Sequence, residues 1–463
     1  DGDAQMAEPK NADEETKDSP SNDDQVGTQK SPQSPSSTDQ NKPQKSDDPS
    51  QMRATLQPLI DSVRETKPAE IWGKVSPETY VAFWALQLGD LFCPEKNYKQ
   101  EKERLHKEEA ILAKDRTDMT RQGQERKMEK RKALMQLQID LSEEQAEQKL
   151  RQAKWKFFLS KLFQASAPEP SPSPESVADT LLEQCFLPRV VLSPADAEYT
   201  YRFIRALHDW NAPGFKLKSL YDRLFNANRI RTLIFTCTVR EAENFGRFFK
   251  LILEDLSRWH KNDPVPGDRA VKDQPRLGAY EKEGKGPSEQ PRLGFALTFD
   301  EDGKPETFVE HDKFKTTLYD WHKNLNTALK VCLGGSEWMH IRNAITVLKA
   351  VLDYLPAVDF MGTLFLNQLR TITKNEAAGT TNEGEGSRVD LSVAAQGAMS
   401  ELMKRKTKWM IVQAFRTGQV DISSSIHPKH ALTGQQVDTS KAETTKAAGL
   451  RATAPEFKPE PTQ

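Results

Sequence analysis

Residues 185–208, CFLPRVVLSPADAEYTYRFIRALH, are the stretch that decides the fold of this chain. A short apolar run ends at a break, and Ser193 then offers an N-cap hydroxyl to the free backbone N–H groups of a new helix. Pro194 occupies the first helical position, where its missing N–H costs nothing, and Asp196 completes a pattern similar to a capping box. Apolar and aromatic residues then recur at helical spacing, at Tyr199, Phe203, Ile204 and Leu207. The stretch predicts a helical hairpin whose second arm is capped and docked on a core.

The composition indicates folded cores diluted by polar segments. The 463 residues are 36% hydrophobic and 29% charged, with a formal net charge of −2, so binding to nucleic acid would need a local basic patch. No stretch is long and apolar enough to cross a bilayer, and the acidic N-terminus does not resemble a signal peptide. Wide spacing favours buried, reduced thiols of an intracellular protein over disulfides or a zinc site for Cys93, Cys185, Cys237 and Cys332.

Helical periodicity dominates the chain, and no convincing strand is found. Because short connections between amphipathic helices make antiparallel neighbours, and stacked pairs build solenoids, we expect an all-α fold. It is an α-solenoid of antiparallel helix pairs with long charged helices, flanked by disordered tails. The expected segments are a disordered acidic/polar linker (1–50), a helical segment with long charged helices (51–163), a Pro/Ser-rich loop (164–175), the α-solenoid core (176–373) with a surface insertion (261–304), a flexible linker (374–387), a basic helical segment (388–416) and a disordered tail (417–463).

The long charged stretch 96–163 predicts two helices with a polar break near residues 117–123. Its leucines are spaced irregularly, and strict heptads are not sustained, so a coiled-coil dimer is not predicted. A mixed run of charges is usually a solvated helix face. A partner-binding arm is the alternative.

Nothing in the sequence predicts catalysis. A phosphate-binding loop after a strand and a metal-binding histidine pair are both missing from the pattern. Trp259-His260 and Trp321-His322 place each tryptophan on an apolar stripe, so the histidine falls at the stripe edge and is interpreted as a boundary residue rather than a catalytic one. Arg342 and Asn343 could contact a partner, although solvent-facing positions explain them equally well. We expect no enzyme activity, no cofactor, no metal, no small-molecule substrate and no membrane contact.

One basic cluster offers a ligand site, formed by Lys404, Arg405, Lys406, Lys408 and Trp409. Clustered cations neutralise phosphates, and the tryptophan could stack on an unpaired base of RNA or single-stranded DNA. The favoured alternative is a basic helix face whose Trp409, Met410 and Val412 are docked on the fold.

Several blocks, in order along the chain, carry a resemblance to a known family. Ser76–Trp84 (SPETYVAFW) comes first. The most specific block then contains Pro188, Arg189, Asp196, Tyr199, Phe203 and His208. Later blocks contain Trp259, His260, Trp321, His322, Arg342 and Asn343. Over roughly residues 70–416 the chain resembles the C-terminal half of the large scaffold subunit of the THO complex, the subunit 2 family, in a fungal-like form.

The resemblance implies a nuclear, non-catalytic α-solenoid scaffold. Such a subunit would hold the other THO subunits, help dock the complex on a DEAD-box RNA helicase, and couple transcription to packaging and export of mRNA. We call the residues named above, from Pro188 to Asn343, the marker residues. The resemblance implies that they are architectural, with Asp196 capping a helix and His208 at the boundary of the packed face. The alternative is an RNA-binding protein that acts through Lys404–Trp409 and the C-terminal tail.

Overall fold

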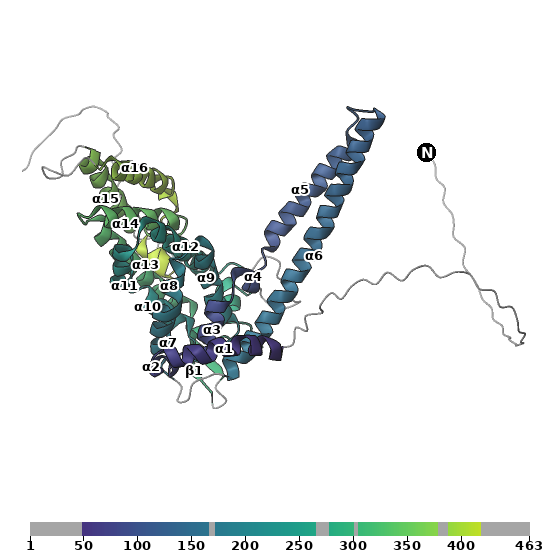
Figure 1. Cartoon of the computed structure of the whole chain (residues 1–463). Coiled ribbons are helices and arrows are strands. Elements are labelled where there is room, and N and C mark those ends of the chain that lie inside the picture. Colours follow the sequence, from purple (N-terminus) through teal and green to yellow (C-terminus); the bar gives the residue numbers. More distant parts are fainter. Residues whose placement is uncertain (1–48, 166–171, 265–276, 301–303, 378–387, 418–463) are drawn as a thin grey trace, which may run out of the picture. The chain divides into compact units, whose positions relative to one another are not determined.

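The structure, a computed structural model, describes residues 49–165, 172–264, 277–300, 304–377 and 388–417. Within these ranges the chain forms 17 α-helices and one two-stranded sheet (Figure 1). Neighbouring helices pack in pairs that stack on one another, so the predicted all-α solenoid is confirmed. The two predicted disordered tails lie outside the described residues, apart from the few that belong to the terminal helices.

The N-terminal part consists of four helices followed by a long helical pair. Their bounds are α1 (Pro49–Thr66), α2 (Ala69–Trp72), α3 (Pro77–Ala85), α4 (Leu88–Leu91), α5 (Glu95–Lys114) and α6 (Arg121–Ala165). Ser76 caps α3, because its hydroxyl oxygen accepts the N–H of Thr79 at 3.2 Å. The buried side chains of Ile60 on α1 and Phe83 on α3 join the main hydrophobic core, so these helices are integral to the solenoid.

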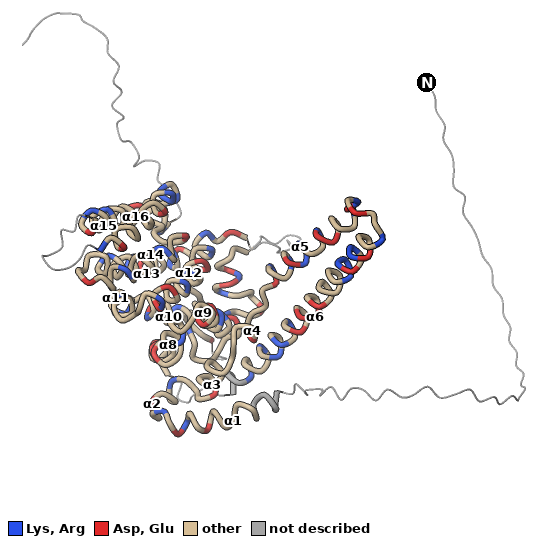
Figure 2. Tube along the Cα trace, turned by 45° about the horizontal axis from the view of Figure 1, so that its top comes forward, with Lys and Arg blue, Asp and Glu red and all other residues tan. Residues whose placement is uncertain are grey.

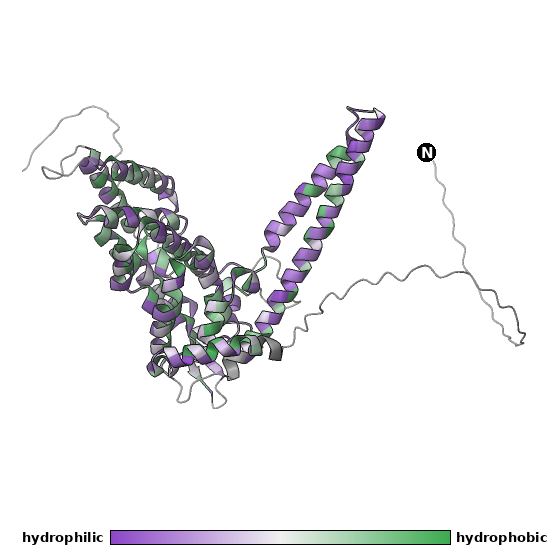
Figure 3. Ribbon diagram, viewed as in Figure 1, coloured by the Kyte–Doolittle hydropathy of each residue, from purple (hydrophilic) through white to green (hydrophobic). Residues whose placement is uncertain are grey.

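Helices α5 and α6 form an antiparallel pair that we call the arm (Figure 1). The Tyr98 hydroxyl donates to Glu144 at 2.9 Å, and Arg131 donates to Glu109 at 2.6 Å, which ties both ends of the pair together. Basic and acidic residues alternate over its surface (Figure 2), with short apolar patches between them (Figure 3). The chain leaves helical geometry between Lys114 and Arg121, and the prediction of two helices with a polar break is confirmed.

The hairpin around residues 185–208 has the predicted form. Its first arm is α7 (Pro174–Leu181), a π-helical turn and α8 (Leu187–Val190), and its second is α9 (Pro194–Asp209). The Ser193 hydroxyl accepts the N–H of Asp196 at 3.0 Å, which satisfies a free donor of the first turn. Helix α9 lies in the core, with Tyr199 and Phe203 both about 1% exposed.

The C-terminal body is a stack of eight helices. Their bounds are α10 (Leu217–Leu224), α11 (Ala227–Thr236), α12 (Val239–Lys261), α13 (His311–Leu333), α14 (Trp338–Val351), α15 (Asp359–Ala377), α16 (Val389–Lys404) and α17 (Val412–Thr417). Thr238 and Glu241 form the predicted capping box at the start of α12. Helices α12 and α14 approach closely at Gly246, where an added Cβ would lie 2.6 Å from the Ala350 side chain.

The expectations of no strand and of a surface insertion at 261–304 are both wrong. Strands β1 (Ala296–Phe299) and β2 (Pro305–Phe308) form an antiparallel hairpin. Tyr280 and Phe295, within the expected insertion, are almost completely buried between α12 and α13. The strands are too short for an alternating pattern, and the two aromatic anchors are hidden among many glycines, prolines and charges. Residues 265–276 and 301–303 lie outside the described residues.

Several predicted boundaries are also wrong by a few residues. Helix α15 continues to Ala377, so the linker expected at 374–387 begins too early. The cause is Glu376, which is buried and accepts two hydrogen bonds of 2.8 Å from Arg388 across the gap between α15 and α16. Helical residues also enter the segments expected to be non-helical at 1–50, 164–175 and 417–463.

Candidate interaction surfaces

Arg189 joins two segments of the chain that are about a hundred residues apart. Arg189 is only 8% exposed. It donates to the carbonyl oxygens of Phe83 and Leu86, the latter at 2.9 Å, which lie at the C-terminal end of α3. Those carbonyls have no partner inside their own helix. The Tyr199 hydroxyl donates to the same Phe83 oxygen at 2.9 Å, so the two marker residues together bind the end of α3.

Asp196 has a second partner besides the helix start. One carboxylate oxygen accepts the Ser193 hydroxyl at 2.7 Å, and the other accepts Nε of Arg189 at 2.9 Å. The guanidinium carbon of Arg189 lies 3.7 Å from the centre of the Tyr199 ring. Asp196 therefore orients Arg189 as well as supporting the cap. Pro188 lies at the start of α8, and Phe203 packs on Phe83 with ring centres 5.0 Å apart.

His208 is not at the boundary of the packed face, as predicted, but inside it. It is 1% exposed, its Nε2 lies 3.0 Å from the carbonyl oxygen of Glu283, and Trp259 and Phe295 pack around the ring. Burial, with nearby Arg205 and Arg292, holds the pKa of His208 well below its ordinary value. The prediction failed because the segment around Glu283 covers the side of α9 that was expected to face solvent.

The two Trp-His pairs differ in burial. Trp259 and Trp321 are core residues, as predicted, and their indole N–H groups donate to Glu283 at 3.0 Å and Asp222 at 2.9 Å. His260 is half-buried, with Nε2 2.7 Å from the Phe415 carbonyl oxygen, as expected of a boundary residue. His322 is buried, contrary to the prediction, because α17 covers it with Phe415. Burial, with the nearby His260, lowers the pKa of His322 to about 3.

The burial of His322 gives a testable pH dependence. Its folded-state pKa of about 3 lies below its ordinary value of 6.5. The buried neutral imidazole therefore makes its full contribution to the free energy of unfolding above pH 6.5, and this contribution is lost as the pH falls. Below pH 6.5 the unfolded chain binds a proton at this histidine and the folded chain does not, which lowers the free energy of unfolding by about 1.4 kcal/mol per pH unit. We expect His322→Gln to make urea stability fall less steeply between about pH 6 and pH 4 by that amount. His106→Gln, on the exposed face of α5, is the control; equal slopes for both variants would contradict the prediction.

Asn343 is buried rather than solvent-facing. It is 0% exposed, and its Nδ2 donates to the carbonyl oxygens of Ile234 at 3.0 Å and Cys237 at 2.5 Å. These carbonyls lie at the C-terminal end of α11, where they lack partners within the helix. Arg342 is half-buried. The solvent-facing expectation is wrong for Asn343 because α14 is covered on more than one side, so the positions beside its apolar stripe are also enclosed.

The basic segment 404–409 turns from the end of α16 towards α15. Lys404, Lys406 and Lys408 are exposed, whereas Arg405 approaches Asp353 at 3.5 Å. The Trp409 ring packs over Gly362 of α15, so closely that a Cβ there would lie 2.5 Å from it. Trp409, Met410 and Val412 are all partly buried against the core, so the docked interpretation of these three is confirmed. What remains open to a ligand is three lysines.

A polar cleft of about 1370 Å³ lies between the base of the arm, α9, α12 and residues 283–293 and 304–305. Its charged lining residues are Lys149, Lys156, Arg202, Arg205, Asp209, Asp255, Arg258, Glu283, Glu289, Arg292 and Lys304. Many of these form ion pairs within the cleft, such as Arg258 with Glu283 at 2.6 Å. His260 and His322 are not in the lining. Sequence analysis missed this cleft because four separate segments build it.

Other site chemistry is sparse in the described residues. All four cysteines are buried and free, and burial raises the pKa of the Cys185 thiol to about 12. Among the described residues, no group of three His, Cys, Asp or Glu side chains is arranged to hold a metal ion. No helix in the same ranges has the length and apolarity needed to span a membrane.

Comparison with known proteins finds several proteins named THO complex subunit 2. THO complex subunit 2 of Homo sapiens is 28% identical over 359 residues, which cover 76% of this chain and 20% of the relative. The Arabidopsis thaliana protein of the same name is 27% identical over 411 residues, 87% of this chain and 20% of the relative. The Saccharomyces cerevisiae protein is 26% identical over 178 residues, 38% of this chain and 8% of the relative.

The chain therefore spans about a fifth of the length of the human and plant relatives it matches. The match also extends to a family model, that of the transcription factor/nuclear export subunit protein 2, which covers residues 72–402. These residues run from the end of α2 to the last turn of α16 and include all of the marker residues. More than half of the chain matches, and the chain belongs to this family.

Proposed function

We propose that this chain is a non-catalytic scaffold segment of a nuclear THO complex. It holds other THO subunits, helps to dock a DEAD-box RNA helicase, and thereby couples transcription to packaging and export of mRNA. The observation that carries the proposal is membership of the subunit 2 family over residues 72–402. A stack of helices offers the extended surface that a multi-protein hub needs.

The use of polar residues inside the fold supports a scaffold role. Hydrogen bonds join helices to each other at Arg189, Asn343 and the indole of Trp321. The buried histidines His208 and His322 are likewise enclosed by the protein. A residue that must meet a substrate needs access to it, which these positions lack. Function then resides on the outer faces of the solenoid and the arm.

Co-expression with the other THO subunits tests the proposal. The tagged 463-residue chain should co-elute with them in stoichiometric amount on size exclusion, and adding the helicase should shift the assembly to larger size. A chain that elutes alone in the presence of all subunits would contradict the scaffold role. A chain that binds the subunits without retaining the helicase would remove only that partner.

The three free lysines favour a second candidate function, binding of single-stranded RNA. Lys404, Lys406 and Lys408 are exposed and make no ion pair in the part of the chain that the structure describes. Changing all three to Gln should lower the slope of log affinity against log salt by roughly 2, since each phosphate contact on a single strand contributes about 0.7. The matched control changes three exposed lysines of α5, Lys96, Lys99 and Lys107, to Gln. Fluorescence anisotropy with an RNA oligonucleotide gives both slopes, and identical slopes would eliminate the patch.

A further inference from the structure

Helix α6 carries an exposed apolar stripe along the arm. Met128, Met135, Ile139, Ala146 and Leu150 are all exposed, and the four larger side chains are more than half exposed. At about 100° per residue these five positions fall within about 60° of one another around the helix. Lys132 and Ser142 complete the same face. A continuous line of this kind differs from the scattered exposed apolar residues that any protein surface has.

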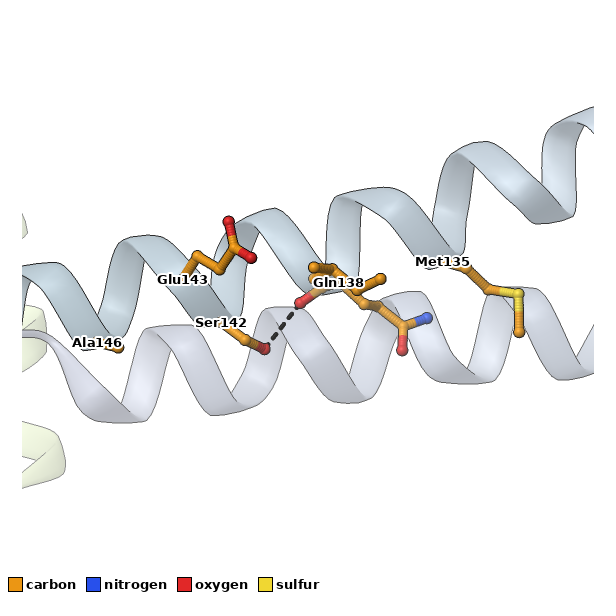
Figure 4. Close-up of a pocket in the computed structure, with 6 residues that line it drawn as sticks. Met135, Gln138, Ser142, Glu143 and Ala146 are labelled. Carbon is orange, nitrogen blue, oxygen red and sulfur yellow. Dashed lines mark hydrogen bonds between the residues drawn. The ribbon is translucent and has the colours of Figure 1, made fainter. Parts of the chain in front are cut away.

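No other helix of the described chain covers this stripe. Helix α5 contacts the other side of α6, where Lys102 donates to Gln145 at 2.9 Å and Tyr98 donates to Gln148 at 2.9 Å. The centre of that contact lies about 140° around the helix from the stripe. A shallow groove of about 550 Å³ follows the middle of the stripe (Figure 4). It is lined by Met135, Gln138, Ile139, Ser142, Glu143 and Ala146.

One flank of the stripe is acidic. Glu125, Glu129, Glu143 and Glu147 are exposed there, and within the described residues none of them forms an ion pair. They stand as two like-charged pairs at i, i+4 spacing, which repel each other within a helix. The other flank holds Arg131 and Lys149, which are already paired with Glu109 and Glu95. Lys132, on the stripe face itself, is exposed and makes no ion pair within the described residues, so against four free carboxylates the net free charge along the stripe is negative.

We propose that this stripe is the docking seam for one amphipathic helix of another protein, whose apolar face covers Met135 and Ile139 and whose adjacent flank carries lysine or arginine. The apolar side chains supply the buried contact, and the flanking charges select the partner and its direction, as in helical coils. The docked helix would become the third helix of the arm. This inference stands on the arm alone and does not depend on the proposed function.

A second copy of this chain fits the seam less well. In an antiparallel two-fold pair the same flank meets itself, so the acidic flank of one copy would face the acidic flank of the other. In a parallel pair the acidic flank would meet Arg131 and Lys149, whose charges are already satisfied. Charge complementarity thus favours a basic helix from a different protein.

The test uses the full chain and two designed helical peptides as probes. Both peptides carry leucine and isoleucine at heptad positions a and d, and they differ only in having lysine or glutamate at the flanking positions. We expect the lysine peptide to bind at least about tenfold more tightly by anisotropy at low salt, where charge pairing is least screened. Ile139→Lys should abolish this binding. Glu143→Lys combined with Glu147→Lys should reverse the preference in favour of the glutamate peptide.

The matched control is Leu137→Lys. Leu137 is also an exposed apolar residue of α6, but it points about 160° away from Ile139 around the helix, so this variant should bind like the parent chain. Circular dichroism of each variant verifies that α6 stays helical. Equal binding of both peptides, binding of neither, or binding unaffected by Ile139→Lys would each overturn the proposal. Self-association of the parent chain that Ile139→Lys removes would assign the seam to a second copy instead.

Discussion

Replacing Arg189 by Met is expected to lower the free energy of unfolding by about 3–5 kcal/mol, the usual range for breaking a buried ion pair. The substitution keeps much of the apolar stem but removes every donor. The carbonyl oxygen of Leu86 then loses its bond of 2.9 Å, Phe83 keeps only the Tyr199 hydroxyl, and Asp196 loses its cation. Urea denaturation followed by circular dichroism measures the loss.

Two further variants separate geometry from charge. Arg189→Lys retains the charge but not the planar fork that reaches two carbonyls and a carboxylate together. Its stability should therefore lie between those of the parent chain and Arg189→Met. Arg247→Met is the matched control, because Arg247 is 53% exposed and its ion pair with Glu198 is on the surface, where such pairs contribute at most about 1 kcal/mol. Equal losses for Arg189→Met and Arg247→Met would show that the buried contacts add nothing.

The hairpin shows what local sequence rules predict well. Ser193, Pro194 and the apolar spacing after them act within a few residues of each other, so capping and the helix start could be read directly. The destination of Arg189 could not, because its partners Phe83 and Leu86 lie more than a hundred residues upstream. The family resemblance identified Arg189 as a marker, and only the packing of α3 against α8 reveals its task.

Burial of polar residues was the main failure of sequence reasoning. His208, His322 and Asn343 were each placed at an edge or on the surface because a stripe pattern assumes that a helix is covered on one side only. In the solenoid, α9 is also covered by the segment around Glu283, and α13 is also covered by α17. Second coverings come from remote parts of the chain, so a local period does not contain them.

The interaction surfaces were predicted unevenly. The basic cluster was found because its cations lie close together in sequence, between Lys404 and Lys408. The docking of Trp409 on Gly362, by contrast, depends on a helix that begins about fifty residues earlier. The α6 seam was visible only as an alternative, a partner-binding arm, since the charges that surround it obscure the stripe. Deciding which apolar residues of the arm face α5 and which stay exposed requires the position of α5.

Phe295→Ala is expected to cost about 3–5 kcal/mol, as for other large aromatic residues deleted from a core. Phe295 is 1% exposed. Its ring centre lies 5.8 Å from that of Trp259, 5.5 Å from Tyr280 and 5.7 Å from Phe314. Removing the ring leaves a cavity between α12 and α13, bounded by rigid rings that can close it only in part. Thermal and urea unfolding should both report the loss.

The matched control for Phe295 lies four residues along, at the end of β1. Phe299 is 39% exposed, and its main contact is the ammonium group of Lys216, 4.5 Å from the ring centre, so Phe299→Ala should cost less than about 1 kcal/mol. A true surface insertion would tolerate both substitutions alike, because neither ring would then support the helices. A large loss for Phe295 alone requires the segment to belong to the core, where it also encloses His208 and accepts the indole N–H of Trp259.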